Sequence, residues 1–177
     1  MANIKPVDRV KLIVAVLWSD TLILQKALKN LETVWGKIDF QGKDREFDVT
    51  DYYVSEMGSP ISRRLVSFEK LINPDTIAEI KLRSNAIENN LAQNSHRKVN
   101  LDAGYLDHNK IILASAKYAG QKIYLGSGIY ADIMGRYKQN QYQPFEWSFP
   151  DFKDGRYNEE LNIIRKIYLQ QLRENKD

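Results

Sequence analysis

Acidic residues gather in one short part of the chain, the segment FDVTDYYVSEMG at residues 47–58. It places three carboxylates around a pair of tyrosines, and a fourth carboxylate stands further along in the segment NLDAGYL. Carboxylates that converge in a fold can hold a divalent cation or divide the roles of general acid and general base. The candidate catalytic residues are therefore Asp48, Asp51, Glu56 and Asp102.

Basic and aromatic side chains elsewhere in the chain indicate a phosphate-bearing ligand. Arginine and lysine bind phosphate oxygens, and tyrosine rings stack on bases. Glu69 stands among apolar neighbours in RRLVSFEKLI, where a carboxylate either faces water or has a partner. If the acids converge, a divalent cation such as Mg²⁺ could support metal-assisted phosphoryl chemistry. The candidate ligand-binding residues are Tyr52, Tyr53, Arg63, Arg64, Glu69, Arg97, Lys122 and Tyr130.

Each of these residues also has a structural interpretation. Asp48 and Asp51 could cap a turn or a short helix through the tyrosine pair. Glu69 could pair with Arg63 or Arg64, and tyrosines are good strand formers on the half-exposed face of an antiparallel sheet. The functional interpretation requires that the acids line one pocket.

The composition is that of one globular domain over residues 1–177, with residues 1–9 as a loose lead-in. Hydrophobic residues make up 43% of the chain and charged residues 28%, which is enough for one compact core. The net charge of +3 tolerates an anionic partner without requiring one. The longest apolar run, VKLIVAVLW, is too short to span a bilayer, so we expect a cytoplasmic protein with no membrane partner.

Several kinds of site are excluded by the residue types and motifs that the sequence lacks. The chain has no cysteine, which excludes disulfides, thiolate zinc sites and cysteine nucleophiles. Because His96 and His108 are the only imidazoles, a metal site would be lined mostly by oxygen. The P-loop pattern GxxxxGK[ST] and the motifs HExxH and GxSxG are absent, and Gly126-Ser127-Gly128 predicts a tight turn between strands.

Periodicity and helix breakers predict the order of the elements. The near-continuous apolar, β-branched run at 10–17 is typical of a strand buried on both faces. Ser19 and Asp20 then supply N-cap chemistry for a helix that ends before Gly36. Residues 110–116 are either a buried strand or a short helix. The other predicted elements are a weak strand or hairpin edge at 38–47, a strand at 63–72, a helix at 74–92, a strand at 99–106, strands at 122–125 and 128–137, a returning strand at 142–149, a loop at 150–155 and a helix at 159–173.

This order predicts an α+β fold with a mainly antiparallel sheet, because strands and helices do not alternate strictly. The opening half, β-α-β-β-α-β, fits a ferredoxin-like, split βαβ arrangement. Extra strands in the C-terminal half would extend that sheet or form a second one, and a helix ends the chain.

Six segments carry a family resemblance: FDVTDYYVSEMG, SFEKLINPDTIAEIK, RKVNLDAGYL, LASAK, KIYLGSGIYAD and FEWSFPDFK. Together they resemble an uncharacterised bacterial family catalogued as domain of unknown function 4416. The resemblance implies a small, single-domain bacterial protein of unknown activity, and some members are labelled GTP-binding. The chain has neither a P-loop nor an NKxD base-reading sequence, so the label serves only as a hint toward nucleotides.

The sequence thus favours a domain that binds a phosphate-bearing ligand, either a nucleotide or RNA. Whether it is an enzyme depends on how its acids are arranged. The alternative is a non-catalytic interaction or scaffold domain that presents the aromatic segment at residues 142–152 to a protein partner. In that segment Trp147, Phe149 and Pro150 together make rigid apolar anchors.

Overall fold

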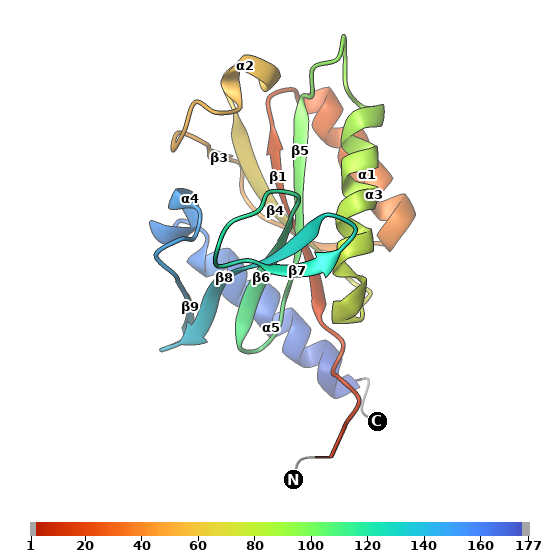
Figure 1. Ribbon diagram of the computed structural model, residues 1–177, viewed down its shortest axis with the longest axis vertical. Coiled ribbons are helices and arrows are strands. Elements are labelled where there is room, and N and C mark those ends of the chain that lie inside the picture. The colour runs from red at the N-terminus through yellow and green to blue at the C-terminus, as the bar shows by residue number, and fades with distance from the viewer. Residues whose placement is uncertain (1–2, 175–177) are drawn as a thin grey trace.

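The computed structural model describes residues 3–174 and shows a nine-stranded sheet with helices against both faces (Figure 1). The main path of the sheet has the strand order β2-β4-β1-β5-β6-β8-β7, with β3 paired to β4 and β9 paired to β8. All of these pairings are antiparallel. The strands are β1 Lys11–Trp18, β2 Ile38–Gln41, β3 Arg45–Glu46, β4 Ser62–Phe68, β5 Val99–Leu106, β6 Lys110–Ser115, β7 Ile123–Gly126, β8 Ile129–Lys138 and β9 Gln141–Pro144.

The helices divide between the two faces of this sheet. Figure 1 shows α1 and α3 together on one side and α5 across the other. Short helical turns occur in three connections. The helices are α1 Thr21–Trp35, α2 Val54–Met57, the 3₁₀ turn η1 Pro74–Thr76, α3 Ile77–Asn90, α4 Pro150–Lys153 and α5 Asn158–Glu174. Among the described residues no helix has the length and apolarity needed to cross a membrane.

The alternation of side chains along β1 explains why both faces are covered. Leu12, Val14 and Val16 are fully buried in the core beneath α1 and α3. Ile13 and Ala15 are fully buried in the second core beneath α5. Because successive side chains of a strand point to opposite faces, an unbroken apolar run needs a layer on each side.

Most predicted elements are confirmed, and residues 110–115 form a strand. Asp20 caps α1 as predicted, since its Oδ1 accepts a hydrogen bond of 3.0 Å from the backbone N–H of Ile23. The α+β class with a mainly antiparallel sheet is confirmed, and the ferredoxin-like description of the opening half stays a prediction.

Three predicted boundaries are wrong. The returning strand predicted at 142–149 ends at Pro144 as β9, because its pairing with β8 stops there. The strand predicted at 63–72 ends at Phe68, so Glu69 is not a mid-strand residue. Its backbone N–H bonds the carbonyl oxygen of Lys37 at 2.9 Å in the connection to β2, and its side chain is exposed. Residues 150–155, predicted as a loop, begin with the helical turn α4, because Pro150 provides the fixed φ that suits a first helical position.

Candidate functional site

The sheet divides between β5 and β6, and this division creates the candidate site. β5 pairs with β1 over its whole length, from Val99 to Leu106. Its pairing with β6 covers only the part from Gly104 to Leu106. The beginning of β5 therefore has an open edge whose backbone groups need other partners, because a buried unpaired amide is costly.

Side chains of α3 supply those partners at Leu101. The carboxylate of Glu88 accepts a hydrogen bond of 2.7 Å from the Leu101 N–H. The ammonium of Lys81 donates one of 2.8 Å to the Leu101 carbonyl oxygen. Both charged side chains are buried, Lys81 to 6% and Glu88 to 2% exposure. They take the place of the strand that β5 lacks there.

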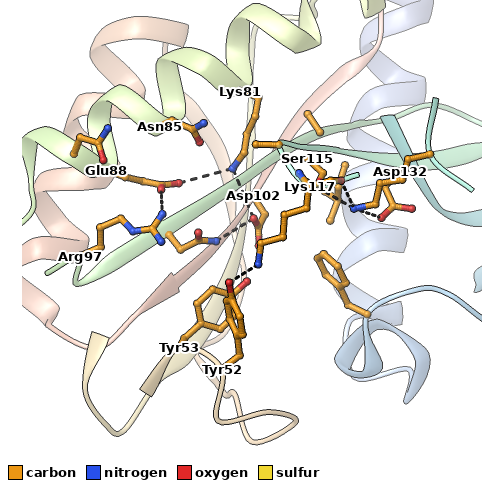
Figure 2. Close-up of a pocket in the computed structure, with 17 residues that line it drawn as sticks. Tyr52, Tyr53, Lys81, Asn85, Glu88, Arg97, Asp102, Ser115, Lys117 and Asp132 are labelled. Atoms are coloured by element: carbon orange, nitrogen blue, oxygen red, sulfur yellow. Dashed lines mark hydrogen bonds and ion pairs between the residues drawn. The ribbon is translucent and has the colours of Figure 1, made fainter. Parts of the chain in front are cut away.

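A cleft of about 330 Å³ lies beside this open edge (Figure 2). Pockets that hold small ligands commonly measure about 300–1,000 Å³. Its walls come from α3, from β5 and β6, from the residues after β6 together with β8, and from aromatic side chains at its mouth. The lining residues are Tyr52, Tyr53, Lys81, Asn85, Glu88, Asn89, Arg97, Asn100, Asp102, Leu113, Ala114, Ser115, Ala116, Lys117, Lys122, Asp132 and Phe149.

The α3 wall is a polar stripe along one face of that helix. Lys81, Asn85, Glu88 and Asn89 are spaced by three and four residues, so they lie on the same side of the helix. No hydrogen bond joins the amide of Asn85 or of Asn89 to another group of residues 3–174. The stripe thus gives the cleft two amides that remain available to a ligand.

Alternating charges form a continuous series along the floor of the cleft and behind it, which we call the charge chain. Neighbouring members lie within 4 Å of each other. Four carboxylates alternate with three cations, so the charge chain has no surplus of positive charge. The members, in order, are Asp151, Arg63, Asp102, Lys81, Glu88, Arg97 and Glu56.

Arg97 is held at one end of the charge chain by two carboxylates. Its Nε and Nη2 lie 2.5 and 2.7 Å from the two carboxylate oxygens of Glu56, and its Nη1 lies 2.9 Å from Oε2 of Glu88. The bond to Glu56 raises the pKa of Arg97, and the same bond lowers the pKa of Glu56. Burial raises the pKa of Glu88. With both partners in place, Arg97 has little capacity left for a phosphate.

Asp102 lies at the centre of the floor. Its Oδ1 accepts from Nδ2 of Asn100 at 3.0 Å, because residues two apart on a strand share a face. Its Oδ2 is 3.3 Å from Nη2 of Arg63, and Nζ of Lys81 is 3.8 Å from Oδ1. Burial raises the pKa of the Tyr53 phenol to about 12, with the negative charge of Asp102 adding to the effect.

Two lysines form the opposite wall. Lys122 Nζ lies 3.2 Å from Oδ2 of Asp132 and donates to Oγ of Ser115 at 2.9 Å and to the carbonyl oxygen of Lys117 at 3.2 Å. These bonds fix the turn that carries Lys117. The Lys117 ammonium reaches across the mouth of the cleft and donates to the Tyr52 hydroxyl at 2.7 Å (Figure 2).

The segment at 47–58 positions the tyrosines of the mouth by burying its two ends. Phe47 and Met57 belong to a small core that also contains Leu17. The Met57 carbonyl oxygen accepts from Ser19 Oγ at 2.5 Å and from Lys98 Nζ at 2.9 Å. Between these anchors the polar middle of the segment projects over the cleft.

The structure brings seven of the predicted site residues together. Tyr52, Tyr53, Arg97, Asp102 and Lys122 line the cleft. The other two bond to lining residues from behind; they are Glu56, through Arg97, and Arg63, through Asp102.

The other predicted site residues lie elsewhere. Asp48 pairs with Arg156 at 3.1 Å, Arg64 pairs with Asp44 at 2.6 Å, and Tyr130 packs against Tyr118 and Tyr124. Asp51 and Glu69 are exposed and do not line the cleft. Capping by Asp51 is not observed either, since the Thr50 hydroxyl accepts the 3.1 Å bond from the Tyr52 N–H.

Of the acids selected from the sequence, Asp102 alone lines the cleft. Asp102 is joined in the cleft by Glu88 and Asp132. Within residues 3–174 no group of three histidine, aspartate or glutamate side chains is arranged to hold a metal ion. Glu88 and Asp132 were missed because each belongs to a helix or strand pattern in which a charged residue predicts an exposed face. The helical spacing of Lys81, Asn85 and Glu88 is the signal that could have found the α3 wall.

The aromatic segment at residues 142–152, which the scaffold alternative assigns to a protein partner, contributes both to the surface and to the cleft. Trp147 is 39% exposed, stacks on Phe145 with ring centroids 4.8 Å apart, and donates from Nε1 to the Ile133 carbonyl oxygen at 3.0 Å. Phe149 lines the cleft and packs edge-on against Phe152. Of the segment at residues 142–152, Phe149 alone lines the cleft.

The burial of several tyrosine side chains predicts that the free energy of unfolding falls at high pH. Burial raises the pKa of Tyr53 and Tyr168 to about 12, and it also raises the pKa of Tyr142 and Tyr157. An unfolded tyrosine ionises near a pKa of about 10. The unfolded chain therefore loses protons that the folded chain keeps, and rising pH favours unfolding. We expect the free energy of unfolding to be constant with respect to these groups below about pH 10 and to fall above it.

Urea denaturation at pH 9, 10 and 11 measures this fall. The fall should be smaller in Tyr53→Phe, which has no proton to lose at that position. An equal fall in the wild type and in Tyr53→Phe would show that the Tyr53 phenol does not contribute.

Comparison with known proteins gives one positive finding. A family model described as domain of unknown function (DUF4416) matches residues 8–168. No curated protein and no solved structure matches the chain significantly. The family match confirms the resemblance carried by the six sequence segments.

Proposed function

The chain belongs to the DUF4416 family, whose shared domain is described only as one of unknown function, and we propose from the cleft that it binds a nucleotide-sized, phosphate-bearing ligand. The observation that carries the proposal is the position of Lys117. Its ammonium lies at the cleft mouth, and its partner is the neutral hydroxyl of Tyr52. Among residues 3–174 no carboxylate lies within 4 Å of this ammonium, so its charge is available to an anion.

The other cations near the cleft have acidic partners and serve mainly to shape it. Arg63, Lys81, Arg97 and Lys122 each lie within 4 Å of at least one carboxylate. The ligand's phosphate would therefore bind at Lys117, on the wall away from the charge chain. An ion-paired lysine or arginine is a weaker phosphate site, because the ligand must compete with an existing charge-assisted bond.

A single nucleotide fits the cleft better than an RNA strand. Strand-binding proteins use an extended basic groove in which successive bases stack on aromatic residues. Here the volume of about 330 Å³ is at the lower end of small-ligand pockets. Tyr52, Tyr53 and Phe149 provide aromatic surface around one opening, enough for one base.

The proposal is one of binding, because the sequence-selected acids do not converge to support metal-assisted chemistry. Asp48 is engaged by Arg156, and Asp51 lies outside the cleft. A divalent ion would enter as the counter-ion of the ligand's own phosphates. The binding screen should accordingly be run with and without Mg²⁺.

Substitution of Lys117 tests the proposal directly. Nucleoside mono-, di- and triphosphates should raise the unfolding temperature of the wild type at low salt, as a ligand of the native state must. In isothermal titration calorimetry, Lys117→Gln should weaken the tightest of them about tenfold or more, as expected for loss of a hydrogen bond to a charged group. Lys26→Gln, the same change on the exposed face of α1, should leave binding unchanged.

Two results would overturn the proposal. One is the absence of any thermal shift or heat of binding with all of these nucleotides. The other is an equal effect of Lys117→Gln and Lys26→Gln, which would reduce binding to a general attraction by net charge.

A further inference from the structure

The wall of the cleft formed by α3 and β5 differs in chemistry from the wall that carries Lys117. It presents carboxylate and amide groups, among them Asp102 and Glu88 of the charge chain, and its cations Lys81 and Arg97 are already paired with carboxylates. A phosphate is disfavoured beside carboxylates, because like charges repel at short range. This wall must therefore contact an uncharged part of the ligand that can donate hydrogen bonds.

Asp102 is the carboxylate of this wall with acceptor capacity to spare. An ionised carboxylate has about four acceptor positions. Asn100 uses one and Arg63 uses another, while the ammonium of Lys81, at 3.8 Å, is beyond hydrogen-bond distance. The Asp102 side chain is 15% exposed, against 2% for Glu88 and 3% for Asp132, the other two carboxylates that line the cleft.

Asn85 and Asn89 supply complementary groups. Each amide offers two donors and an acceptor, and within residues 3–174 neither has a hydrogen-bond partner. A hydroxyl group both donates and accepts, so it can donate to the Asp102 carboxylate while it accepts from an amide. Two neighbouring hydroxyls could therefore bond to the Asp102 carboxylate and to an asparagine amide at the same time. Figure 2 shows Asn85 on the α3 wall and Asp102 on the floor of the same cleft.

We propose that this wall recognises the vicinal hydroxyls of a ribose, with Asp102 as the principal acceptor and Asn85 as a supporting contact. The inference rests on the proposed function and specifies its ligand class as ribose-bearing phosphates, with discrimination against their 2′-deoxy counterparts. A site built to bond a hydroxyl rejects the analogue that lacks it, because its own buried polar groups are then left unpaired.

Matched pairs of ligands test the inference. The probes are the four nucleoside 5′-monophosphates with their 2′-deoxy forms, and ribose 5-phosphate with 2-deoxyribose 5-phosphate, which removes the base. Calorimetric titration of the wild-type protein should give about tenfold or more tighter binding of the ribose member of a pair. The base-free pair should show the same preference, which separates recognition of hydroxyls from recognition of a base edge.

Two variants of α3 locate the preference. Asn85→Ala should reduce the ribose-to-deoxyribose ratio, whereas Asn90→Ala, the same change on the same helix outside the cleft, should leave it unchanged. Asp102→Asn should reduce the ratio further, provided that circular dichroism and urea denaturation show that this variant folds. If it does not fold, the comparison of Asn85→Ala with Asn90→Ala tests the inference.

The outcomes separate the two proposals. Equal binding of ribose and deoxyribose members by the wild type would overturn the inference and leave the proposed function in place. Equal ratios in Asn85→Ala and Asn90→Ala would also overturn the assignment to this wall. Absence of binding by every probe would overturn the proposed function, and the inference with it.

Discussion

Arg63→Ala should lower the free energy of unfolding by about 3–5 kcal/mol, the loss expected when one partner of a buried ion pair is removed. Arg63 is 1% exposed, and Asp151, whose carboxylate accepts from its Nη1, is completely buried. Without the guanidinium, the Tyr157 hydroxyl, at 2.9 Å, is the one hydrogen-bond donor left to the Asp151 carboxylate among residues 3–174. Urea denaturation followed by circular dichroism measures the loss.

The neighbouring arginine is the matched control. Arg64 pairs with Asp44, and both side chains are partly exposed, so Arg64→Ala should cost about 1 kcal/mol or less. Replacing both members of the buried pair, as in Arg63→Met with Asp151→Leu, should recover most of the loss, because apolar groups of similar volume often substitute for a buried pair. Equal losses for Arg63→Ala and Arg64→Ala would contradict the central position of Arg63.

Arg63 also connects the aromatic segment to the cleft. Its guanidinium lies 4.7 Å from the ring centroid of Phe47 and 5.7 Å from that of Phe149, while its Nη2 contacts Asp102. α4 is thereby attached to the floor through Asp151. This arrangement explains why Phe149 is held at the cleft.

The opening of the fold could be predicted from sequence because its signals are local. The apolar run of β1 needs no partner to be recognised, and the cap of α1 depends on Asp20 and the three residues that follow it. The predicted end of β4 was wrong because alternation continues beyond Phe68, while pairing with the neighbouring strands stops there. Strand ends are fixed by partners that are distant in the sequence.

The cleft could be predicted only in part for the same reason. Asp102, Tyr52 and Tyr53 were selected because polar and aromatic residues stand out in short segments. Lys81 and Glu88 were not, because their burial depends on the open edge of β5, and that edge exists only where β6 departs. From sequence alone, buried charged residues on a helix cannot be told from exposed ones until the neighbouring strand is known.

Gly104→Ala should destabilise the junction of β5 and β6 by about 3 kcal/mol, at the upper end of the usual cost of overpacking. A Cβ at Gly104 would lie 2.1 Å from the Ile112 carbonyl oxygen and 2.9 Å from Cα of Leu113. Both atoms belong to the backbone of β6, so no rotamer change can relieve the contact and the strands must separate. Urea denaturation measures the cost.

Gly120→Ala is the matched control, because a Cβ there meets nothing within 4 Å, and it should change stability by less than about 0.5 kcal/mol. The cleft also begins at Gly104. The pairing of β5 with β6 covers Gly104 to Leu106 and does not extend to Asp102. A forced separation should therefore displace Asp102 relative to Ser115 and weaken nucleotide binding in Gly104→Ala and not in Gly120→Ala. Comparable stability and binding in the two variants would show that close contact of these strands does not shape the cleft.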